Sequence, residues 1–181
     1  MLEKEIIEIR EIIKSISIKL ARDEVDEYTV TRTEIAPTDK SPIITSNDEE
    51  IAFELGKFGF EKWDGKGVII NARSETILEK SMFKKHITNG RCVVPASGYY
   101  EWKLSKEGKN KKIKHMIKDK ASNLLFMAGL WREGKDGREF VVITKDPVGI
   151  VTEIHDRMPV ILRVDQIEAW FKVANIVKTI F

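Results

Sequence analysis

The hydrophobic pattern at the start of the chain is that of an amphipathic helix, which we predict over residues 1–21. Apolar side chains recur there at spacings of three and four residues and form a single stripe: Ile6, Ile9, Ile13, Ile16 and Leu20. We interpret this stripe as a surface that packs on a core rather than as a groove for a partner.

The next segments combine an alternating pattern with a possible helix start. Tyr28, Val30 and Arg32 alternate with smaller residues, which predicts a strand followed by an extended, proline-containing loop. In SNDEEIAFELGKFGF, residues 46–60, a polar residue at the start can act as a helix cap, and acidic residues follow in the first turn. We therefore predict a helix over 46–60.

From residue 67 onward the pattern changes mainly to strands. The segments 91–104 and 112–119 are predicted to pair across a polar loop, and 123–133 and 138–146 flank GKDG as a hairpin. A further strand and three helices are predicted at 67–72, 74–90, 147–154 and 164–172. Because strands and helices do not alternate regularly, we predict an α+β fold in one domain over residues 1–181.

Composition agrees with one globular domain and excludes several classes. The 181 residues are 42% hydrophobic and 33% charged, and no apolar run is long enough to span a bilayer. Acidic residues interrupt the first apolar positions, so we predict no signal peptide and a cytoplasmic protein that binds no membrane. The single cysteine, Cys92, excludes an intramolecular disulfide and a CxxC-type zinc site, and we predict neither a metal nor a cofactor.

Charge is distributed unevenly along the chain. Through Lys66 there are 10 basic and 16 acidic residues, whereas the remainder carries 21 basic and 13 acidic residues. Eight of the lysines lie between Lys103 and Lys120. Such a segment can bind a polyanion, or it can be the solvated face of a hairpin whose lysines protect an edge strand.

Several short motifs occur in an order that resembles the SRAP family, the SOS response-associated peptidase domain. The matching segments are IAPTDKSPII, KFGFEKW, INARSET, MF, RCVVPASGYYEWK, FVVITKD and HDRMPVIL. The resemblance extends over residues 28–165. It implies a compact mixed α/β domain built around a barrel-like sheet.

The resemblance also implies a function. Members of this family recognise abasic sites in single-stranded DNA and attach to them through an N-terminal cysteine, which forms a Schiff base and then a thiazolidine with the sugar aldehyde. A self-processing peptidase activity gives the family its name. By this resemblance we expect a monomeric, nucleoid-associated protein of the DNA-damage response whose partner is abasic single-stranded DNA.

Site residues are transferred from the family motif by motif. The implied catalytic residues are Asn71, Glu101 and His155. An acid/base pair is needed to open the sugar and dehydrate the carbinolamine, and an amide can orient the sugar without titrating. The DNA-binding residues implied in the same way are Pro37, Trp63, Arg73, Thr144 and Arg157, with arginines suited to phosphate and tryptophan to a base.

The sequence departs from the family at its second position, which is Leu2 instead of cysteine. Cys92 cannot replace the missing residue, because a thiazolidine needs the amine and the thiol of one residue, and we predict that Cys92 is buried and inert. We expect a true start upstream, with a degenerate DNA-binding homologue or Schiff-base chemistry by the terminal amine as alternatives. The alternative functions are a non-catalytic single-stranded DNA-binding module and a hydrolase that uses Cys92 and His155.

Overall fold

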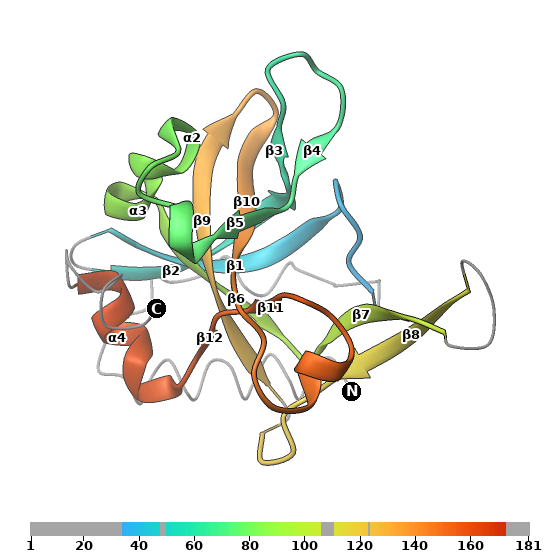
Figure 1. The fold of residues 1–181 in the computed structure, drawn as a ribbon. Helices are drawn as coiled ribbons and strands as arrows, with labels where there is room; N and C mark the ends of the chain where they lie inside the picture. The colour runs from blue at the N-terminus through green and yellow to red at the C-terminus, as the bar shows by residue number, and fades with distance from the viewer. Residues whose placement is uncertain (1–33, 48–49, 106–110, 123, 173–181) are drawn as a thin grey trace.

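The computed structural model describes residues 34–47, 50–105, 111–122 and 124–172. The helix predicted over 1–21 and the strand predicted at Tyr28 to Arg32 lie outside these residues. Figure 1 shows long strands wound around one another, with short helices packed at one side and two hairpins that project from the body.

Five strands close a mixed barrel, in the order β10-β2-β1-β6-β9 and back to β10. All neighbouring pairs are antiparallel except β10 and β2, which are parallel. The bounds of these strands are Lys40–Asn47 for β1, Glu50–Phe58 for β2, Arg91–Ala96 for β6, Leu125–Gly134 for β9 and Gly137–Lys145 for β10. The prediction of an α+β fold around a barrel-like sheet is confirmed.

Strands β6, β9 and β10 are buried on both faces over most of their length, which explains why they appear in the sequence as nearly unbroken apolar runs. Along β10, Phe140 and Val142 join one buried cluster, whereas Val141 and Ile143 join the other. Of the two clusters, only the one that contains Val141 and Ile143 includes residues from helices, such as Trp170. The cluster of Phe140 and Val142 therefore fills the barrel, and the other cluster lies between the barrel and its helical cover.

The helical cover consists of short segments. The helices are α2 (Ser81–Lys84), α3 (His86–Asn89) and α4 (Val164–Lys172). The prediction for 164–172 is confirmed, and the Trp170 indole N–H on α4 donates to the Cys92 carbonyl of β6 at 3.0 Å. The continuous helix predicted over 74–90 is instead the 3-10 turn η2 (Ser74–Thr76) followed by α2 and α3, because Lys80 has an extended backbone.

The helix predicted over residues 46–60 is wrong. This segment contains the end of β1, all of β2 and the first residue of the short strand β3 (Phe60–Glu61). Ile51 and Phe53 are buried at alternate positions and β2 pairs with β1 along its whole length. The sheet pairing and this period-two burial outweigh the capping residues that favoured a helix.

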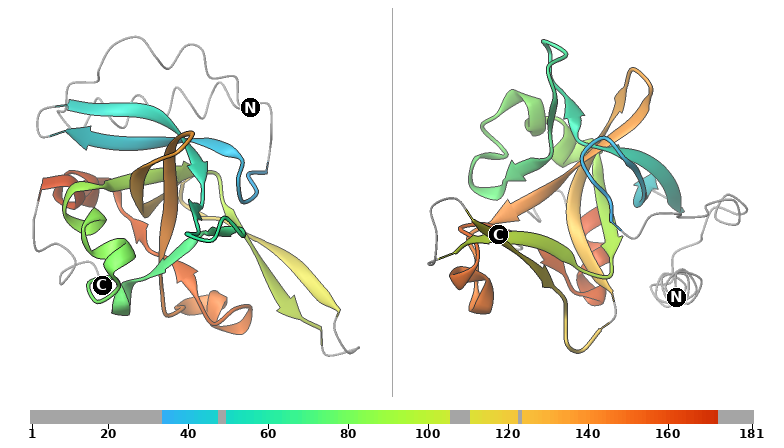
Figure 2. Two further views of the ribbon diagram at one scale, coloured as in Figure 1. Left: turned by 90° about the horizontal axis from the view of Figure 1, so that it is seen from above. Right: turned by 90° about the vertical axis from the view of Figure 1, so that its right-hand side faces the viewer.

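Two hairpins project from the barrel in Figure 1, and Figure 2 shows one of them, β7–β8, in its left view and the other, β3–β4, in its right view. One pairs β3 with β4 (Val68–Ile69), and the other pairs β7 (Tyr99–Leu104) with β8 (Lys112–Ile117). The predicted pairing of 91–104 with 112–119 is therefore confirmed for its β7 half only. The other half is β6, which pairs with β1 and β9 inside the barrel.

A buried ionic cluster lies near the start of β10. Glu139 is 1% exposed, and its carboxylate accepts from Arg132 Nε at 2.9 Å and from the Glu61 backbone N–H at 3.1 Å. Lys57 Nζ lies 3.1 Å from its other oxygen. Burial alone raises the pKa of a carboxyl group, but these hydrogen bonds outweigh it and lower the pKa of Glu139.

The far end of β10 is where separate parts of the chain converge. Thr144 pairs with Arg73 of β5 (Asn71–Arg73) in parallel and with Pro159 of β11 (Met158–Pro159) in antiparallel. The segment between β10 and β11 includes the 3-10 turn η3 (Gly149–Glu153), and β12 (Ile161–Leu162) then pairs with β9. No helix within the described ranges is both long and apolar enough to span a membrane.

Candidate acid/base site at the end of β10

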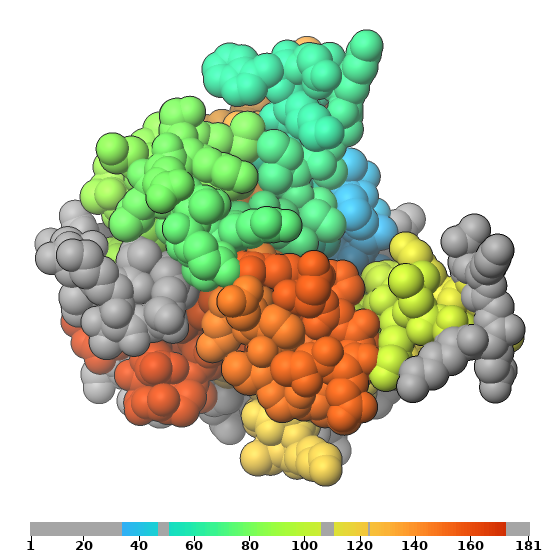
Figure 3. All heavy atoms as spheres, viewed as in Figure 1, coloured from blue at the N-terminus to red at the C-terminus, as the bar shows by residue number. Residues whose placement is uncertain are grey.

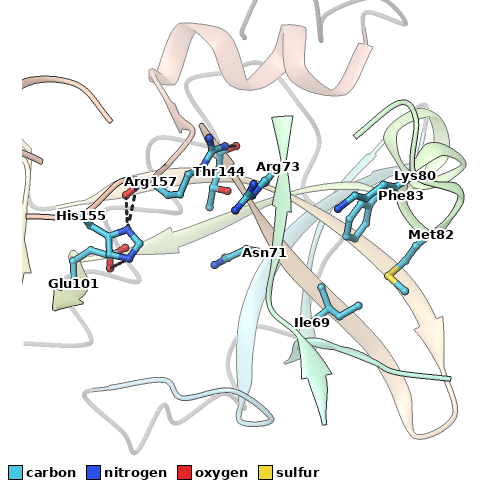
Figure 4. Close-up of a pocket in the computed structure, with 10 residues that line it drawn as sticks. All are labelled: Ile69, Asn71, Arg73, Lys80, Met82, Phe83, Glu101, Thr144, His155 and Arg157. Carbon is cyan, nitrogen blue, oxygen red and sulfur yellow. Dashed lines mark hydrogen bonds and ion pairs between the residues drawn. The ribbon is translucent and has the colours of Figure 1, made fainter. Parts of the chain in front are cut away.

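A cavity of about 420 Å³ lies beside the end of β10. Figure 4 shows that side chains from several separate segments point toward it. Its lining residues are Ile69, Asn71, Arg73, Lys80, Met82, Phe83, Glu101, Thr144, His155 and Arg157. The structure thus brings together the three predicted catalytic residues and three of the five predicted DNA-binding residues, although their roles remain predictions.

Strand pairing explains why residues so distant in sequence meet here. β5 delivers Asn71 and Arg73 next to Thr144, and the segment before β11 delivers His155 and Arg157 to the other side of the same threonine. In the space-filling view this last segment, coloured orange, lies between the green region of residues 71–90 and the yellow-green β7 (Figure 3). Glu101 enters from β7.

Glu101 and His155, two of the predicted catalytic residues, lie next to each other in the cavity. Glu101 Oε2 lies 3.7 Å from His155 Nε2, and the Glu101 side chain is 19% exposed. Desolvation raises the pKa of Glu101, the nearby Asp156 charge raises it further, and His155 partly opposes the rise. A carboxyl group with a raised pKa retains its proton over a wider pH range and can act as a general acid.

The other nitrogen of His155 faces its own chain segment. The Arg157 backbone N–H lies 3.1 Å from Nδ1, the Asp156 carboxylate 3.1 Å and the Arg157 carbonyl oxygen 3.3 Å. The ring is therefore held by Nδ1, and Nε2 is directed toward Glu101.

Arg157 is anchored by two acidic residues and a backbone carbonyl. Its guanidinium donates to both oxygens of Glu75, to Asp146 Oδ1 at 2.6 Å and to the Thr144 carbonyl at 2.8 Å. The Arg157 hydrogen bond lowers the pKa of Glu75 to about 2. Glu75 and Asp146 were not predicted as site residues, because isolated acidic residues in loops give no signal in the sequence.

The rest of the cavity combines positive charge with an apolar end. The guanidinium of Arg73 has no hydrogen bond or ion pair within the described part of the chain, so it is available to an anion. Lys80 adds a second cation, and Ile69, Met82 and Phe83 form an apolar wall. Sequence reasoning missed these four residues because lysines and apolar side chains on short elements resemble ordinary surface and core positions.

Two predicted DNA-binding residues lie outside the cavity lining. Pro37 is exposed in the turn before β1. Trp63 lies in the turn that joins β3 to β4 and is 96% exposed. The structure gives neither residue a place in the cavity, but the exposed indole of Trp63 remains suited to stacking on a base.

Cys92 takes no part in this site. It is fully buried on β6, belongs to the cluster inside the barrel, and burial strongly raises the pKa of its thiol. The prediction that Cys92 is buried is confirmed, and the Cys92–His155 hydrolase loses its nucleophile. Within the described ranges there is also no group of three or more His, Cys, Asp or Glu side chains that could hold a metal ion.

The protein is thus a mixed β-barrel with a cavity at one end of β10. This cavity contains a glutamate, a histidine and several basic side chains. The model of the SOS response associated peptidase (SRAP) family matches residues 3–179, and the chain belongs to this family. It is 40% identical over 112 residues to the abasic site processing protein YoqW of Bacillus subtilis, a match that covers 59% of this chain and 49% of YoqW. It is 30% identical over 152 residues to the abasic site processing protein YedK of Escherichia coli, covering 81% and 67% of the two chains.

The matched region thus spans about half the length of YoqW. Solved structures agree with the fold. A crystal structure of a protein from Bacteroides thetaiotaomicron has a TM-score of 0.68 at 29% identity, covering 79% of this chain and 68% of the other. A phage-related protein from Bordetella bronchiseptica has a TM-score of 0.66 at 30% identity, covering 80% and 70%.

Proposed function

We propose that this protein recognises and processes abasic sites in single-stranded DNA. The observation that carries the proposal is the Glu101–His155 pair, which lies in one cavity with Asn71 and with the unpaired cation of Arg73. The names of YoqW and YedK, which are abasic site processing proteins, support the same substrate.

The cavity residues suit the chemistry of an abasic sugar. The sugar exists mainly as a closed hemiacetal, so a proton must leave the ring hydroxyl and another must reach the ring oxygen before an aldehyde is exposed. Glu101 and His155 are placed to make these transfers, and the Asn71 amide can hold a sugar hydroxyl without titrating. Once an amine has attacked the aldehyde, protonation of the carbinolamine hydroxyl releases water and leaves an imine.

DNA contacts are assigned to the residues around this centre. Arg73 and Arg157 are proposed to bind the phosphates that flank the sugar, which position a strand without specifying its sequence. Trp63 is proposed to stack on a neighbouring base, with Pro37 beside the strand and Thr144 at the cavity wall. We further propose a cytoplasmic, nucleoid-associated monomer, in keeping with the proposed DNA substrate.

The attacking amine is the step that the test must resolve. The second position is Leu2, and none of the described residues offers an amine and a thiol on the same residue. We therefore assign sugar binding, ring opening and dehydration to this chain and separate them from thiazolidine formation.

The experiment compares abasic and intact single strands of the same sequence with the chain as it exists. Fluorescence anisotropy measures binding, and sodium borohydride followed by a denaturing gel traps an imine. We expect tighter binding to the abasic strand and a trapped adduct that Glu101→Gln removes. Equal affinity for both strands without an adduct contradicts abasic-site processing.

A matched variant tests the thiol. Leu2→Cys, with the initiator methionine removed, should give an adduct that is stable without borohydride, and Leu2→Ser is its control. Failure of Leu2→Cys to crosslink would contradict thiazolidine formation by the N-terminus of this chain.

A non-catalytic DNA-binding module is the second candidate, favoured by the unpaired Arg73 and the exposed indole of Trp63. It predicts salt-sensitive binding of intact and abasic strands alike, with no trapped adduct.

A further inference from the structure

The Nδ1 atom of His155 has neighbours that cannot all be satisfied at once. The Arg157 backbone N–H, 3.1 Å away, can only donate, and the Asp156 carboxylate at 3.1 Å and the Arg157 carbonyl at 3.3 Å can only accept. An unprotonated Nδ1 satisfies the N–H and opposes the two acceptors. A protonated Nδ1 satisfies an acceptor and leaves the N–H without this partner.

The choice at Nδ1 decides what Nε2 presents to Glu101. In a neutral imidazole one nitrogen carries the proton and the other is an acceptor. If Nδ1 is unprotonated, an Nε2–H faces Glu101 and favours its carboxylate. If Nδ1 is protonated, Nε2 offers a lone pair and favours a Glu101 carboxylic acid as its partner.

We propose that Asp156 is a positioning residue that keeps the proton of neutral His155 on Nδ1 and thereby leaves Nε2 as an acceptor for the acid form of Glu101. The carboxylate of Asp156 lies 3.1 Å from Nδ1, and its negative charge favours a proton there over the dipole of the Arg157 backbone N–H. Glu101, Asp156 and the imidazole between them form a carboxyl–imidazole–carboxylate row.

The charges that face this row agree with the assignment. On the Nε2 side the nearest ionisable group is Glu101 of β7, 3.7 Å away. On the Nδ1 side lies the carboxylate of Asp156, 3.1 Å away. The positive charge of Arg157 is paired with Glu75 and Asp146. The Asp156 charge also raises the pKa of Glu101, which favours the same acid form.

This arrangement gives a balanced dehydration step. Glu101 gives its proton to the carbinolamine hydroxyl, the carbon–oxygen bond breaks, water leaves, and the nitrogen lone pair forms the C=N bond. Glu101 is then a carboxylate. A proton from water can bind at Nε2, so that the two N–H groups of the imidazolium face Asp156 and Glu101, and it then passes to Glu101 to restore the acid.

The first test needs no DNA and so does not depend on the proposed function. The ¹⁵N shifts of an imidazole distinguish a protonated Nδ1 from a protonated Nε2, and His155→Gln assigns the signals among the three histidines. We expect Nδ1–H in the neutral ring of the parent chain, retention of Nδ1–H in Asp156→Glu, which keeps a carboxylate, and a shift to Nε2–H in Asp156→Ala.

The Asp156 variants should fold, because the side chain is 83% exposed. Glu153→Gln is the matched control, since it removes an exposed carboxylate from the same segment and leaves Nδ1 unchanged. The same tautomer in the parent chain and in Asp156→Ala would overturn the proposal.

The second test rests on the proposed function and measures imine formation at saturating abasic DNA. We expect Asp156→Ala to slow it by roughly 10- to 100-fold, as the loss of an outer partner of a functional histidine does. Asp156→Glu, which keeps the negative charge, should recover most of the rate. If the parent chain has no activity, the proposed function is contradicted, and the ¹⁵N result alone decides whether Asp156 sets the tautomer of His155. If Asp156→Ala shifts the tautomer but leaves the rate unchanged, the claim that the tautomer matters for imine formation is overturned.

Discussion

Arg157 and Glu75, which are 82 positions apart in sequence, form a bidentate ion pair on the wall of the cavity. Nη1 donates to Oε1 at 2.5 Å and Nη2 donates to Oε2 at 2.8 Å. Because the pKa of Glu75 is lowered to about 2, this carboxylate stays ionised at any pH suited to a DNA-binding assay. The residue proposed to bind a phosphate is thus already neutralised by a competing anion.

Removing that competitor should strengthen DNA binding. In Glu75→Gln the guanidinium remains held by Asp146 and the Thr144 carbonyl, so its position is kept and one of its two anionic partners is removed. We expect tighter binding of single-stranded DNA at low salt and a salt slope steeper by about one phosphate contact. Fluorescence anisotropy over a salt series measures both, with the exposed Glu79→Gln as the control for charge alone. Equal gains in the two variants would show that local neutralisation of Arg157 is unimportant.

Replacement of Glu101 should separate activity from stability. Glu101→Gln removes the general acid, and imine formation should fall by roughly 10²- to 10⁴-fold. The raised pKa means that the ionised carboxylate destabilises the folded state, a cost that appears as pH rises above the ordinary value of a glutamate and is complete above the folded-state pKa.

The variant should therefore unfold at higher urea than the parent chain at neutral pH. This advantage should vanish at acidic pH, where the carboxyl group is protonated in both states. The activity of the parent chain should fall as alkali deprotonates Glu101. Glu153→Gln, which lies outside the cavity, should leave both measurements unchanged, and an active Glu101→Gln would exclude the assigned acid role.

Cys92 should behave as a packing residue. Cys92→Ala should cost about 1–2 kcal/mol of unfolding free energy, as expected for a small void inside a barrel, and should leave imine formation unchanged. Because burial raises its pKa, the thiol should react with iodoacetamide only after unfolding, which mass spectrometry can follow with and without urea. A loss of activity without a loss of stability would revive a chemical role for the thiol.

Trp63 should contribute to DNA affinity but not to folding. Its side chain is 96% exposed, so Trp63→Ala should leave the urea midpoint unchanged. If the indole stacks on a base, the same variant should lose roughly 1–3 kcal/mol of binding free energy. Trp63→Phe keeps an aromatic face and should retain most of the affinity, and equal losses in both variants would point to an effect other than stacking.

Local patterns predicted the parts of this fold that have strong local signals. The hairpin of β9 and β10 and the helix α4 follow directly from a polar turn and from apolar spacing. The segment 46–60 misled the prediction, because its capping residues are local whereas its partner strand β1 and the parallel contact with β10 are set by the tertiary structure. Parallel pairing between distant segments leaves no periodicity in the sequence.

The candidate site, like the fold, was predicted only in part. Asn71, Glu101 and His155 were predicted because the family motifs carry them, and strand pairing does bring them to one cavity. Glu75 and Lys80 were missed, since the contact of Glu75 with Arg157 depends on side-chain geometry.

Strand β10 also has a consequence for how accurately the fold must assemble. Glu139 near its start has one compatible environment, the cluster of Arg132, Lys57 and the Glu61 backbone N–H. A shift of one residue in the register of β10 would move the Glu139 charge to the opposite face of the strand. The same shift would turn the Thr144 side chain away from the cavity. The buried carboxylate therefore fixes the register of β10. A chain that buries Glu139 against these partners also has Thr144 in the position that lines the cavity.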